Sequence, residues 1–319
     1  MPSSPPRFVV ATLRAAGCVF AEDEARLLTA TARTPAELAV LVDRRVGGEP
    51  LEHVLGRAEF CGLQVALDPG VFVPRRRTEF LVRQAAALVG PGAVVVDLCC
   101  GSGAVGAALA RPGVEVHAAD VDPAAVRCAR RNLAAAGARV YEGDLYAPLP
   151  AALRGRVDVL VVNPPYVPTA AIGLLPAEAR LHEPPVALDG GADGLDVQRR
   201  VAAAAPAWLA PGGHLLVETS ADQASRTVAA VAGGGLTARV TSCAEVDATV
   251  VIGARSGGAV DRSRDQEHGP RPPQQRRPRE PRALPEDLRH ALGQSDTLLG
   301  GRRVEGSVAD IVGPGIDEL

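Results

Sequence analysis

The sequence predicts an α/β protein in which helices cover both faces of a mostly parallel sheet, with a small helical domain in front of it. Two patterns carry this prediction. Between about residues 77 and 255, short runs rich in valine and leucine alternate with helical segments, which is typical of a parallel sheet buried on both faces. Near the end of this region, segments 236–243 and 247–254 lie too close together for a crossover helix. They predict an antiparallel hairpin at the sheet edge.

The first part of the chain, residues 1–57, predicts a small domain of short helices. Leucines recur there at helical spacing, and Thr34-Pro35 followed by Glu37 is a typical helix start. Residues 58–76 alternate between apolar and polar side chains. They predict a β-hairpin connector with its turn at Asp68-Pro69-Gly70.

The catalytic region is expected to span residues 77–255, with helices from about Ala104, over Pro123–Ala136 and near 194–209. Its sheet should hold seven strands, over 94–96, 114–119, 139–141, 157–162, 214–217, 236–243 and 247–254. Residues 256–319 lack a hydrophobic period and are rich in Arg, Pro and Gln, which predicts a disordered tail.

Composition narrows the function classes. The net charge of -3 gives no basic footprint, so stable binding to nucleic acid is not expected. The six cysteines have no zinc-type spacing, which predicts reduced thiols and no metal site. No segment reaches the roughly 20 apolar residues that a membrane span needs. We therefore expect a cytoplasmic monomer that does not bind membranes.

A Gly-rich turn between the first strand and its helix is the candidate cofactor loop. Glycine lets the chain turn sharply and lets the backbone approach a ligand. The next helix then presents free N–H groups to an anionic group. The loop and its flanks hold six candidate residues, Asp97, Cys99, Cys100, Gly101, Ser102 and Gly103.

Two more acids follow neighbouring strands. Asp120 ends the second strand, where a carboxylate can accept hydrogen bonds from two ribose hydroxyls. Asp144 follows the third strand and is placed to reach an adenine amine, with Leu145 beside the ring. Gly101, Gly103 and Gly106 nearly complete the pattern of a nicotinamide dinucleotide site. The loop alone therefore does not distinguish a nicotinamide dinucleotide from another cofactor that contains adenosine.

The fourth strand ends in Asn163-Pro164-Pro165-Tyr166, at the edge where open α/β sheets bind ligands. Two prolines fix φ and remove two N–H donors, so the carbonyl groups of the turn can serve as acceptors. The Asn163 side-chain oxygen and the Pro164 carbonyl can each accept one hydrogen from a planar NH2 group. Tyr166 can pack against the plane of that group, and Asn163 is also a candidate contact of the cofactor.

This motif fits methylation of an amide nitrogen. An amide lone pair is delocalised, and no ordinary side chain removes its proton beforehand. The site has to align the nitrogen with an activated methyl group and stabilise the positive charge that develops on nitrogen. We therefore expect no general base.

A mostly parallel sheet that ends in an antiparallel hairpin resembles the class I, Rossmann-like methyltransferase fold. Over about residues 20–254 the sequence also resembles the HemK/PrmC-type protein-glutamine N5-methyltransferases, which modify the Gly-Gly-Gln loop of peptide-chain release factors. The matching segments, in chain order, are Gly48–Gly56 with Glu59-Phe60, Val73–Arg75 with Thr78-Glu79, Asp97–Gly103, Asn163–Tyr166, Glu183-Pro184, Ala187–Gly191 and Asp193–Leu195.

The resemblance implies S-adenosyl-L-methionine as the cofactor and a release factor as the protein substrate. It implies that the Gly-rich loop holds the methionine carboxylate and that the N-terminal domain helps to recognise the substrate. The chain departs from the family at Arg76-Arg77, where Pro-Asp is usual, and its N-terminal region is shorter.

Two other functions compete with this one. A nucleic-acid amino-methyltransferase, acting on rRNA or DNA, would use the same Asn-Pro-Pro-aromatic motif, because adenine, cytosine and guanine also carry planar amines. Such enzymes usually add a basic or base-flipping module. A cofactor-binding regulator without activity is the other alternative, and the intact Asp120 and Asn163 argue against it.

Overall fold

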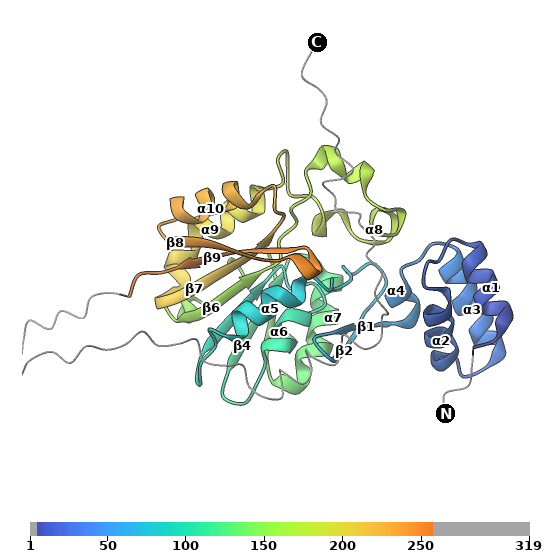
Figure 1. Ribbon diagram of the computed structural model, residues 1–319. Coiled ribbons are helices and arrows are strands. Elements are labelled where there is room, and N and C mark those ends of the chain that lie inside the picture. Colours follow the sequence, from blue (N-terminus) through green and yellow to red (C-terminus); the bar gives the residue numbers. More distant parts are fainter. Residues whose placement is uncertain (1–4, 258–319) are drawn as a thin grey trace, which may run out of the picture.

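The computed structural model describes residues 5–257 and has a seven-stranded sheet as its centre (Figure 1). The strand order is β5-β4-β3-β6-β7-β9-β8. The five strands β3, β4, β5, β6 and β7 run parallel to one another, whereas β9 is antiparallel to both β7 and β8. The predicted fold and its edge hairpin are therefore confirmed. The predicted tail, apart from its first two residues, lies outside the described part of the chain.

The sheet strands agree closely with the predicted ones. Only β7 is markedly longer, because it begins directly after a helix. The strands are β3 (Val94–Leu98), β4 (Glu115–Asp120), β5 (Arg139–Glu142), β6 (Val157–Val162), β7 (Leu209–Thr219), β8 (Thr237–Cys243) and β9 (Ala248–Ala254).

Helices cover the sheet on both faces, as Figure 1 shows. Successive strand residues point to opposite faces. Val94 and Val96 pack into the core under α9 and α10, whereas Val95 packs into the core under α5 and α6. The covering helices are α5 (Thr78–Ala86), α6 (Ala104–Leu109), α7 (Pro123–Leu133, extended by the 3-10 turn Ala134–Ala136), α9 (Asp196–Trp208) and α10 (Ala224–Gly233).

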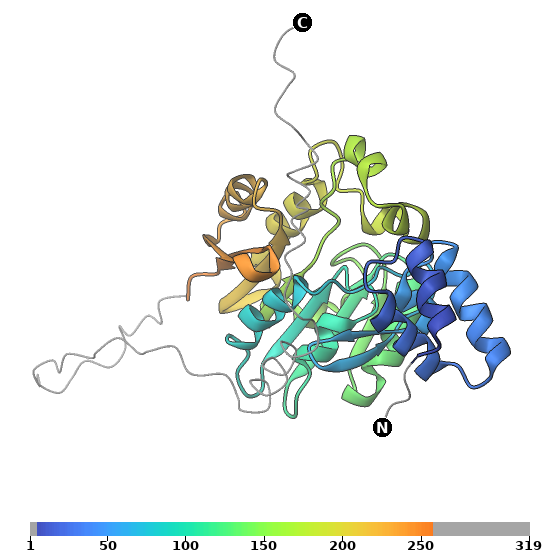
Figure 2. The same ribbon diagram turned by 45° about the vertical axis from the view of Figure 1, so that its right-hand side comes forward.

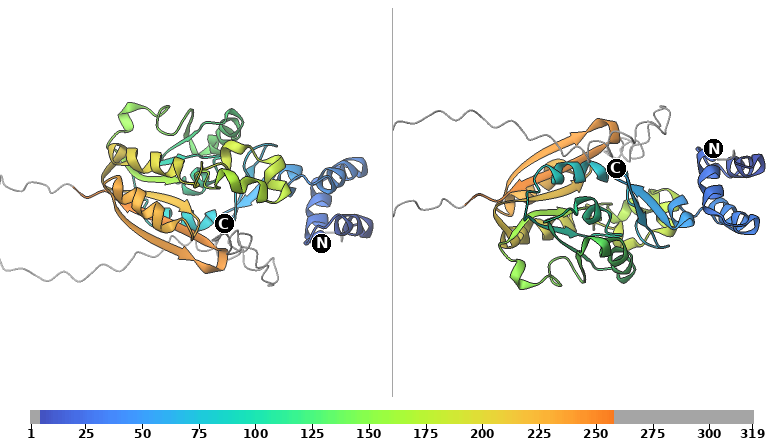
Figure 3. Two further views of the ribbon diagram at one scale, coloured as in Figure 1. Left: turned by 90° about the horizontal axis from the view of Figure 1, so that it is seen from above. Right: turned by 90° about the horizontal axis from the view of Figure 1, so that it is seen from below.

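The N-terminal helices have a core of their own, which includes Val9, Leu13 and Leu28. The expected start of α3 is present, because the Thr34 hydroxyl accepts a hydrogen bond from the Glu37 N–H at 3.1 Å. Figure 3 shows these helices at one end of the molecule, joined to the sheet through β1 and β2. They are α1 (Arg7–Ala15), α2 (Ala21–Thr31), α3 (Pro35–Val46) and α4 (Leu51–Leu55).

The connector corrects one sequence prediction. The hairpin consists of β1 (Arg57–Phe60) and β2 (Leu63–Ala66), with Phe60 paired to Leu63, so its turn is Cys61-Gly62 and not Asp68-Pro69-Gly70. Both turn residues have positive φ, 50° and 73°. A cysteine rarely adopts this conformation, and for that reason the sequence did not indicate the turn.

Between β6 and α9 the chain forms an irregular excursion at the carboxyl edge of the sheet. In Figure 2 it lies next to the N-terminal helices. A partly buried ion pair joins the two, because Arg45 of α3 contacts Glu178 of the excursion at 2.6 Å, while it also contacts Glu24 of α2 at 2.7 Å. The excursion contains α8 (Ala177–His182) and the 3-10 turns Thr169–Leu174 and Pro185–Ala187. Among the described helices, none is long and apolar enough to cross a membrane.

Candidate functional site

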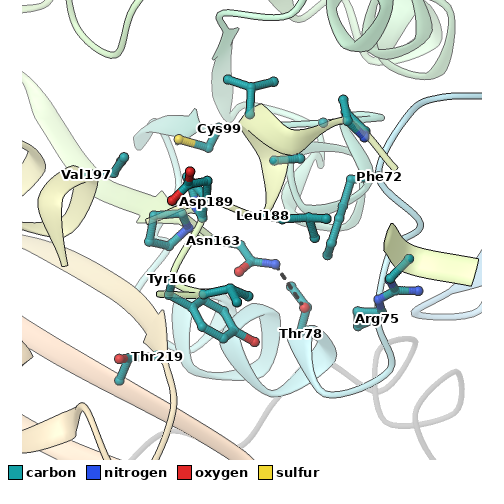
Figure 4. A pocket seen from close by; sticks show the side chains of 18 of the residues that line it. Phe72, Arg75, Thr78, Cys99, Asn163, Tyr166, Leu188, Asp189, Val197 and Thr219 are labelled. Carbon is teal, nitrogen blue, oxygen red and sulfur yellow. Dashed lines mark hydrogen bonds between the residues drawn. The ribbon is translucent and has the colours of Figure 1, made fainter. Parts of the chain in front are cut away.

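A cavity of about 980 Å³ opens at the carboxyl edge of the sheet, where strands β3, β4, β6 and β7 end. It takes in all of the predicted site residues except Gly103, and Figure 4 shows part of its lining. One side is formed by the β3 loop and the ends of β4 and β5. The other side is formed by the Asn163–Tyr166 turn, the start of α5 and the excursion. The predicted cofactor and amide residues thus share one cavity.

The β3 loop turns through left-handed backbone conformations. Cys99 and Gly101 both have φ of 54°, and Gly103 has φ of 78°. A Cβ on Gly103 would lie 3.1 Å from the Cα of Ala129 in α7. Gly103 therefore serves the packing of α6 on α7, whereas Gly101 lies on the cavity wall. Burial raises the pKa of the Cys99 and Cys100 thiols, so both are protonated at neutral pH.

Asp97, at the end of β3, is only 2% exposed. Its carboxylate accepts a hydrogen bond from the Gly106 N–H at 2.9 Å. A Cβ on Gly106 would lie 3.3 Å from the same oxygen, so the glycine allows this close approach. Burial raises the pKa of Asp97 to about 7. The site thus keeps a costly buried carboxylate in the wall of the cavity.

Asp120 is tied to the β3 loop through its side chain. One carboxylate oxygen accepts from the Gly101 N–H at 2.8 Å and the other from the Asp122 N–H at 2.9 Å. Burial raises the pKa of Asp120, while these two N–H donors act in the opposite direction. The carboxylate is held in one orientation, with further lone pairs for the hydroxyl groups of a ligand.

Asp144 and Leu145 follow β5 on the same side of the cavity. The Asp144 carboxylate is paired with the Arg200 guanidinium of α9. Leu145 is 9% exposed and has φ of 49°. Leu145 can therefore offer an apolar surface to a flat ring, with an acceptor next to it.

These acids decide what kind of ligand suits this side of the cavity. Asp97, Asp120 and Asp144 bring three carboxylates to it, and the Arg200 cation is already paired with one of them. The surplus of negative charge favours a ligand with hydroxyl and amine donors and a positive charge. It disfavours a pyrophosphate, which needs cations and free N–H donors. The residues therefore fit a sulfonium nucleoside better than a nicotinamide dinucleotide.

On the opposite wall, the Asn163 side chain is oriented by a residue that the sequence did not single out as functional. The Asn163 amide donates a hydrogen bond to the Thr78 hydroxyl at 3.3 Å (Figure 4). Thr78 is the first residue of α5 and is 3% exposed. With its nitrogen held by Thr78, the Asn163 amide turns its oxygen the other way, as an acceptor for a donor in the cavity.

Tyr166 ends the turn, and Arg77 lies over its ring at 5.8 Å from the centroid. Burial raises the pKa of Tyr166 to about 12, so the phenol is neutral at physiological pH. Behind Arg77 lies Glu218, at the end of β7, which is 2% exposed and 3.5 Å from the Arg77 Nε. Burial raises the pKa of Glu218, while the Arg77 guanidinium beside it acts in the opposite direction.

Arg75 and Arg77, which line the cavity, have carboxylate partners within the chain. Arg75 contacts both oxygens of the buried Glu183 at 2.6 Å, and Arg77 forms the ion pair with Glu218. The positive charge of these two side chains is therefore largely balanced inside the protein.

Sequence reasoning missed Glu218 and Gln223, and it assigned no role to Thr78 and Glu183, although both lie in segments that resemble the family. Glu218 and Gln223 stand at and just after the carboxyl end of β7. The rule that ligands bind beyond the carboxyl ends of parallel strands was a signal that could have found them. No local pattern pointed to the pairing of Thr78 with Asn163, because the two lie 85 residues apart.

Residues 5–257 contain no set of side chains that could bind a metal ion. No group of three or more His, Cys, Asp or Glu side chains there is arranged to hold an ion.

Comparison with known proteins shows what the chain is similar to. The Methyltransferase small domain family matches residues 62–178. A release factor glutamine methyltransferase of Geobacter sulfurreducens is 45% identical over 197 residues, covering 60% of this chain and 68% of the relative. One from Mycolicibacterium smegmatis is 41% identical over 227 residues, covering 69% of this chain and 80% of the relative.

A third relative carries another name. It is the 4-amino-L-phenylalanine/4-methylamino-L-phenylalanine methyltransferase of Streptomyces pristinaespiralis, 43% identical over 186 residues, covering 56% of this chain and 63% of the relative. The chain spans 80% of the Mycolicibacterium relative and 68% of the Geobacter relative, and both are release factor glutamine methyltransferases. On this basis, the chain belongs to the release factor glutamine methyltransferase family.

Proposed function

We propose that this protein transfers a methyl group from S-adenosyl-L-methionine to the side-chain amide nitrogen of a protein glutamine, in the Gly-Gly-Gln motif of a peptide-chain release factor. The observation that carries the proposal is the Asn163–Tyr166 turn, which faces the cavity with its Asn163 amide held by Thr78. The names of the relatives support the substrate.

The acidic side of the cavity would hold the cofactor. When bound, S-adenosyl-L-methionine supplies a methyl group that its sulfonium charge activates. Asp120 would accept hydrogen bonds from ribose hydroxyls, and Asp144 would accept one from the adenine amine beside Leu145. The Asp97 carboxylate would lie close to the positively charged end of the cofactor. Cys99 to Gly103 would shape the loop around it.

The opposite side would hold the glutamine amide. The Asn163 oxygen and the Pro164 carbonyl each accept one hydrogen of the amide NH2 group, which fixes the plane of the amide and the direction of its lone pair. The same acceptors stabilise the positive charge that grows on nitrogen during transfer. Tyr166 covers the amide plane and, with its pKa raised to about 12, stays protonated and serves no base role.

The organisation of the chain supports a protein substrate. Residues 1–57 carry their own small core and stand beside the excursion that lines the cavity. We assign this N-terminal domain to substrate recognition, residues 58–76 to the connector and residues 77–255 to catalysis. A substrate of the translation machinery would place the chain in the cytoplasm.

Incubation with labelled S-adenosyl-L-methionine and a methyl acceptor tests the proposal. Release factor purified without its methylase should take up label, whereas ribosomal RNA should not. Asn163→Ala should abolish transfer and leave cofactor affinity within about twofold by calorimetry, because Asn163 orients the amide and not the cofactor. Label found only in RNA would refute the protein substrate, and an equal loss of cofactor binding would refute the role of Asn163.

One relative suggests a second candidate, the methylation of a small amino acid that carries an amine. Arg75 and Arg77 line the cavity and could meet the carboxylate of such a substrate. Their existing ion pairs with Glu183 and Glu218 make this weaker than the protein substrate. Adding 4-amino-L-phenylalanine as a third acceptor separates the two, since turnover of this amine alone would favour the second candidate.

A further inference from the structure

The side chain of Gln223 holds the backbone of the Asn163–Tyr166 turn. The side chain lies just beyond β7 and is 4% exposed. Its Nε2 group donates a hydrogen bond to the Tyr166 carbonyl at 2.9 Å and another to the Asp193 carbonyl at 3.2 Å. One amide group therefore uses both of its hydrogens on two backbone carbonyls that lie 27 residues apart in the chain.

The orientation of this amide is itself fixed. The Ser220 hydroxyl donates to the Gln223 Oε1 at 3.2 Å, which leaves the NH2 group facing Tyr166. The Thr227 hydroxyl lies 2.6 Å from the Gln198 Oε1 and 3.1 Å from the backbone carbonyl of Gln223, and it can donate its one hydrogen to either of these acceptors. Thr227 and Gln198 are fully or almost fully buried. Gln223 is thus the end of a buried polar network that reaches the cavity wall.

Gly194 makes room for the contact. Its φ is 76°, and a Cβ there would overlap both the Gln223 Nε2 and the Tyr166 carbonyl oxygen. The close approach of three chain segments at this point therefore requires glycine.

The turn needs such a support for a physical reason. Pro164 and Pro165 have no N–H group, so the middle of the turn cannot donate hydrogen bonds of its own. Asn163 is held from the α5 side by Thr78, and Tyr166 is held from the β7 side by Gln223. The two contacts hold the two ends of the turn, and the next residue, Val167, is held by backbone hydrogen bonds with Leu188 and Gly190.

We propose that Gln223 is a positioning residue for methyl transfer, which places the Tyr166 ring and the acceptors of the turn against the methyl donor. This inference rests on the proposed function for its chemical meaning. Misplacement of a reacting group by about 1 Å costs on the order of 100-fold in rate. Loss of the Gln223 contact should therefore act on the transfer step and not on cofactor affinity.

Gln223→Glu is the sharpest test, because it keeps the shape and removes both N–H donors. At pH 8, kcat should fall roughly 10- to 100-fold, with the KM for the acceptor and the Kd for the cofactor within about twofold. Burial will raise the pKa of the introduced carboxyl, and its protonated form can donate one hydrogen bond. The ratio of variant to wild-type kcat should therefore rise as the pH is lowered.

Gln64→Glu is the matched control, since it makes the same charge change on the exposed face of β2. It should leave kcat and its pH profile unchanged. A second route to the same contact is Gly194→Ala, which should lower kcat at every pH without the recovery at low pH. A loss of folding caused by the buried charge would also recover at low pH, so urea unfolding of Gln223→Glu at pH 8 provides the separation: a variant that is folded at pH 8 and still has a lowered kcat has lost positioning and not its structure.

Hydrogen exchange of the Asn163, Tyr166 and Val167 amides provides a readout that needs no substrate. The Gln223→Glu variant should exchange these amides faster than wild type, and Gln64→Glu should not. If wild type methylates only some other acceptor, the proposed substrate fails and the kcat test proceeds on that acceptor. Unchanged kcat, pH profile and exchange in Gln223→Glu would overturn the positioning role.

Discussion

The Asn163 side-chain amide donates a hydrogen bond to the Thr78 hydroxyl at 3.3 Å, and this contact joins the end of β6 to the first residue of α5. It places one acceptor of the candidate amide site under the control of a residue 85 positions away. A side-chain oxygen can select an NH2 group only if its own amide is held in one orientation.

Thr78→Val should therefore lower kcat, because it keeps the shape of the side chain and removes the acceptor for the Asn163 amide. We expect a fall of roughly 10-fold, which corresponds to about 1.4 kcal/mol, within the range of one ordinary hydrogen bond. Steady-state kinetics on the methyl acceptor measure it. Thr78→Ser keeps the hydroxyl and is the control. An equal loss in both variants would contradict the orienting role.

Arg77→Met should destabilise the protein more at alkaline than at acidic pH. The variant leaves Glu218 buried without its cation, and burial already raises the pKa of that carboxyl. When the pKa of an acid is higher in the folded than in the unfolded protein, the free energy of unfolding falls as the pH rises from the unfolded-state pKa to the folded-state pKa. Since Arg77 is 38% exposed, we expect only roughly 1–3 kcal/mol at pH 8, and less at pH 5.

Urea unfolding at the two pH values measures this effect. The double variant Arg77→Met/Glu218→Gln provides the control, because it removes the uncompensated charge. It should regain most of the stability at pH 8 and lose the pH dependence. If the double variant were no more stable than Arg77→Met, the ion pair would not be the cause.

Asp97→Asn should stabilise the ligand-free protein above neutral pH. Burial raises the pKa of Asp97 from its ordinary 3.8 to about 7. Its ionisation therefore lowers the free energy of unfolding as the pH rises between these two values, by a few kcal/mol as an order of magnitude. Asparagine avoids this cost and can still accept from the Gly106 N–H.

The same variant should bind S-adenosyl-L-methionine more weakly, because it lacks the charge that we propose to lie close to the positively charged end of the cofactor. Thermal unfolding at pH 5 and pH 8, with calorimetry of cofactor binding, tests both statements. A gain of stability at pH 5 equal to that at pH 8 would show that ionisation of Asp97 is not responsible.

Gly103→Ala should cost more stability than Gly137→Ala. Both glycines have positive φ, at 78° and 65°, so alanine pays the same backbone strain of about 1–2 kcal/mol in either place. Only at Gly103 would the new Cβ also press on Ala129 and Leu133, each at 3.1 Å. We expect roughly 1–3 kcal/mol in addition, measured by urea unfolding. Equal losses of stability in the two variants would mean that α6 and α7 can move apart to accept the new Cβ at no energetic cost.

The sequence predicted those site residues that can be recognised from their residue type and their position at the end of a strand. Asp97, Asp120 and Asn163 each stand at the end of a buried strand, and strand ends of a parallel sheet meet at one edge. Their shared cavity follows from the strand order. The edge hairpin could also be predicted, because a short connection excludes a crossover helix.

The supports of the site could not be predicted in this way. Thr78 and Gln223 act through partners 85 and 57 positions away, and no local period encodes such distances. The Arg77–Glu218 pair likewise exists only after α5 has packed near the end of β7. The misplaced connector turn has a different cause, since Cys61 adopts a positive φ that cysteine rarely takes.

The most direct test of the proposed reaction is mass spectrometry of the release-factor peptide that contains Gly-Gly-Gln, after incubation with this enzyme and S-adenosyl-L-methionine. We expect the mass of one added CH2 group, localised by fragmentation to the glutamine side chain, in wild type and not in Asn163→Ala. A peptide that stays unmodified, while RNA or a small amine gains the methyl group, would contradict the account.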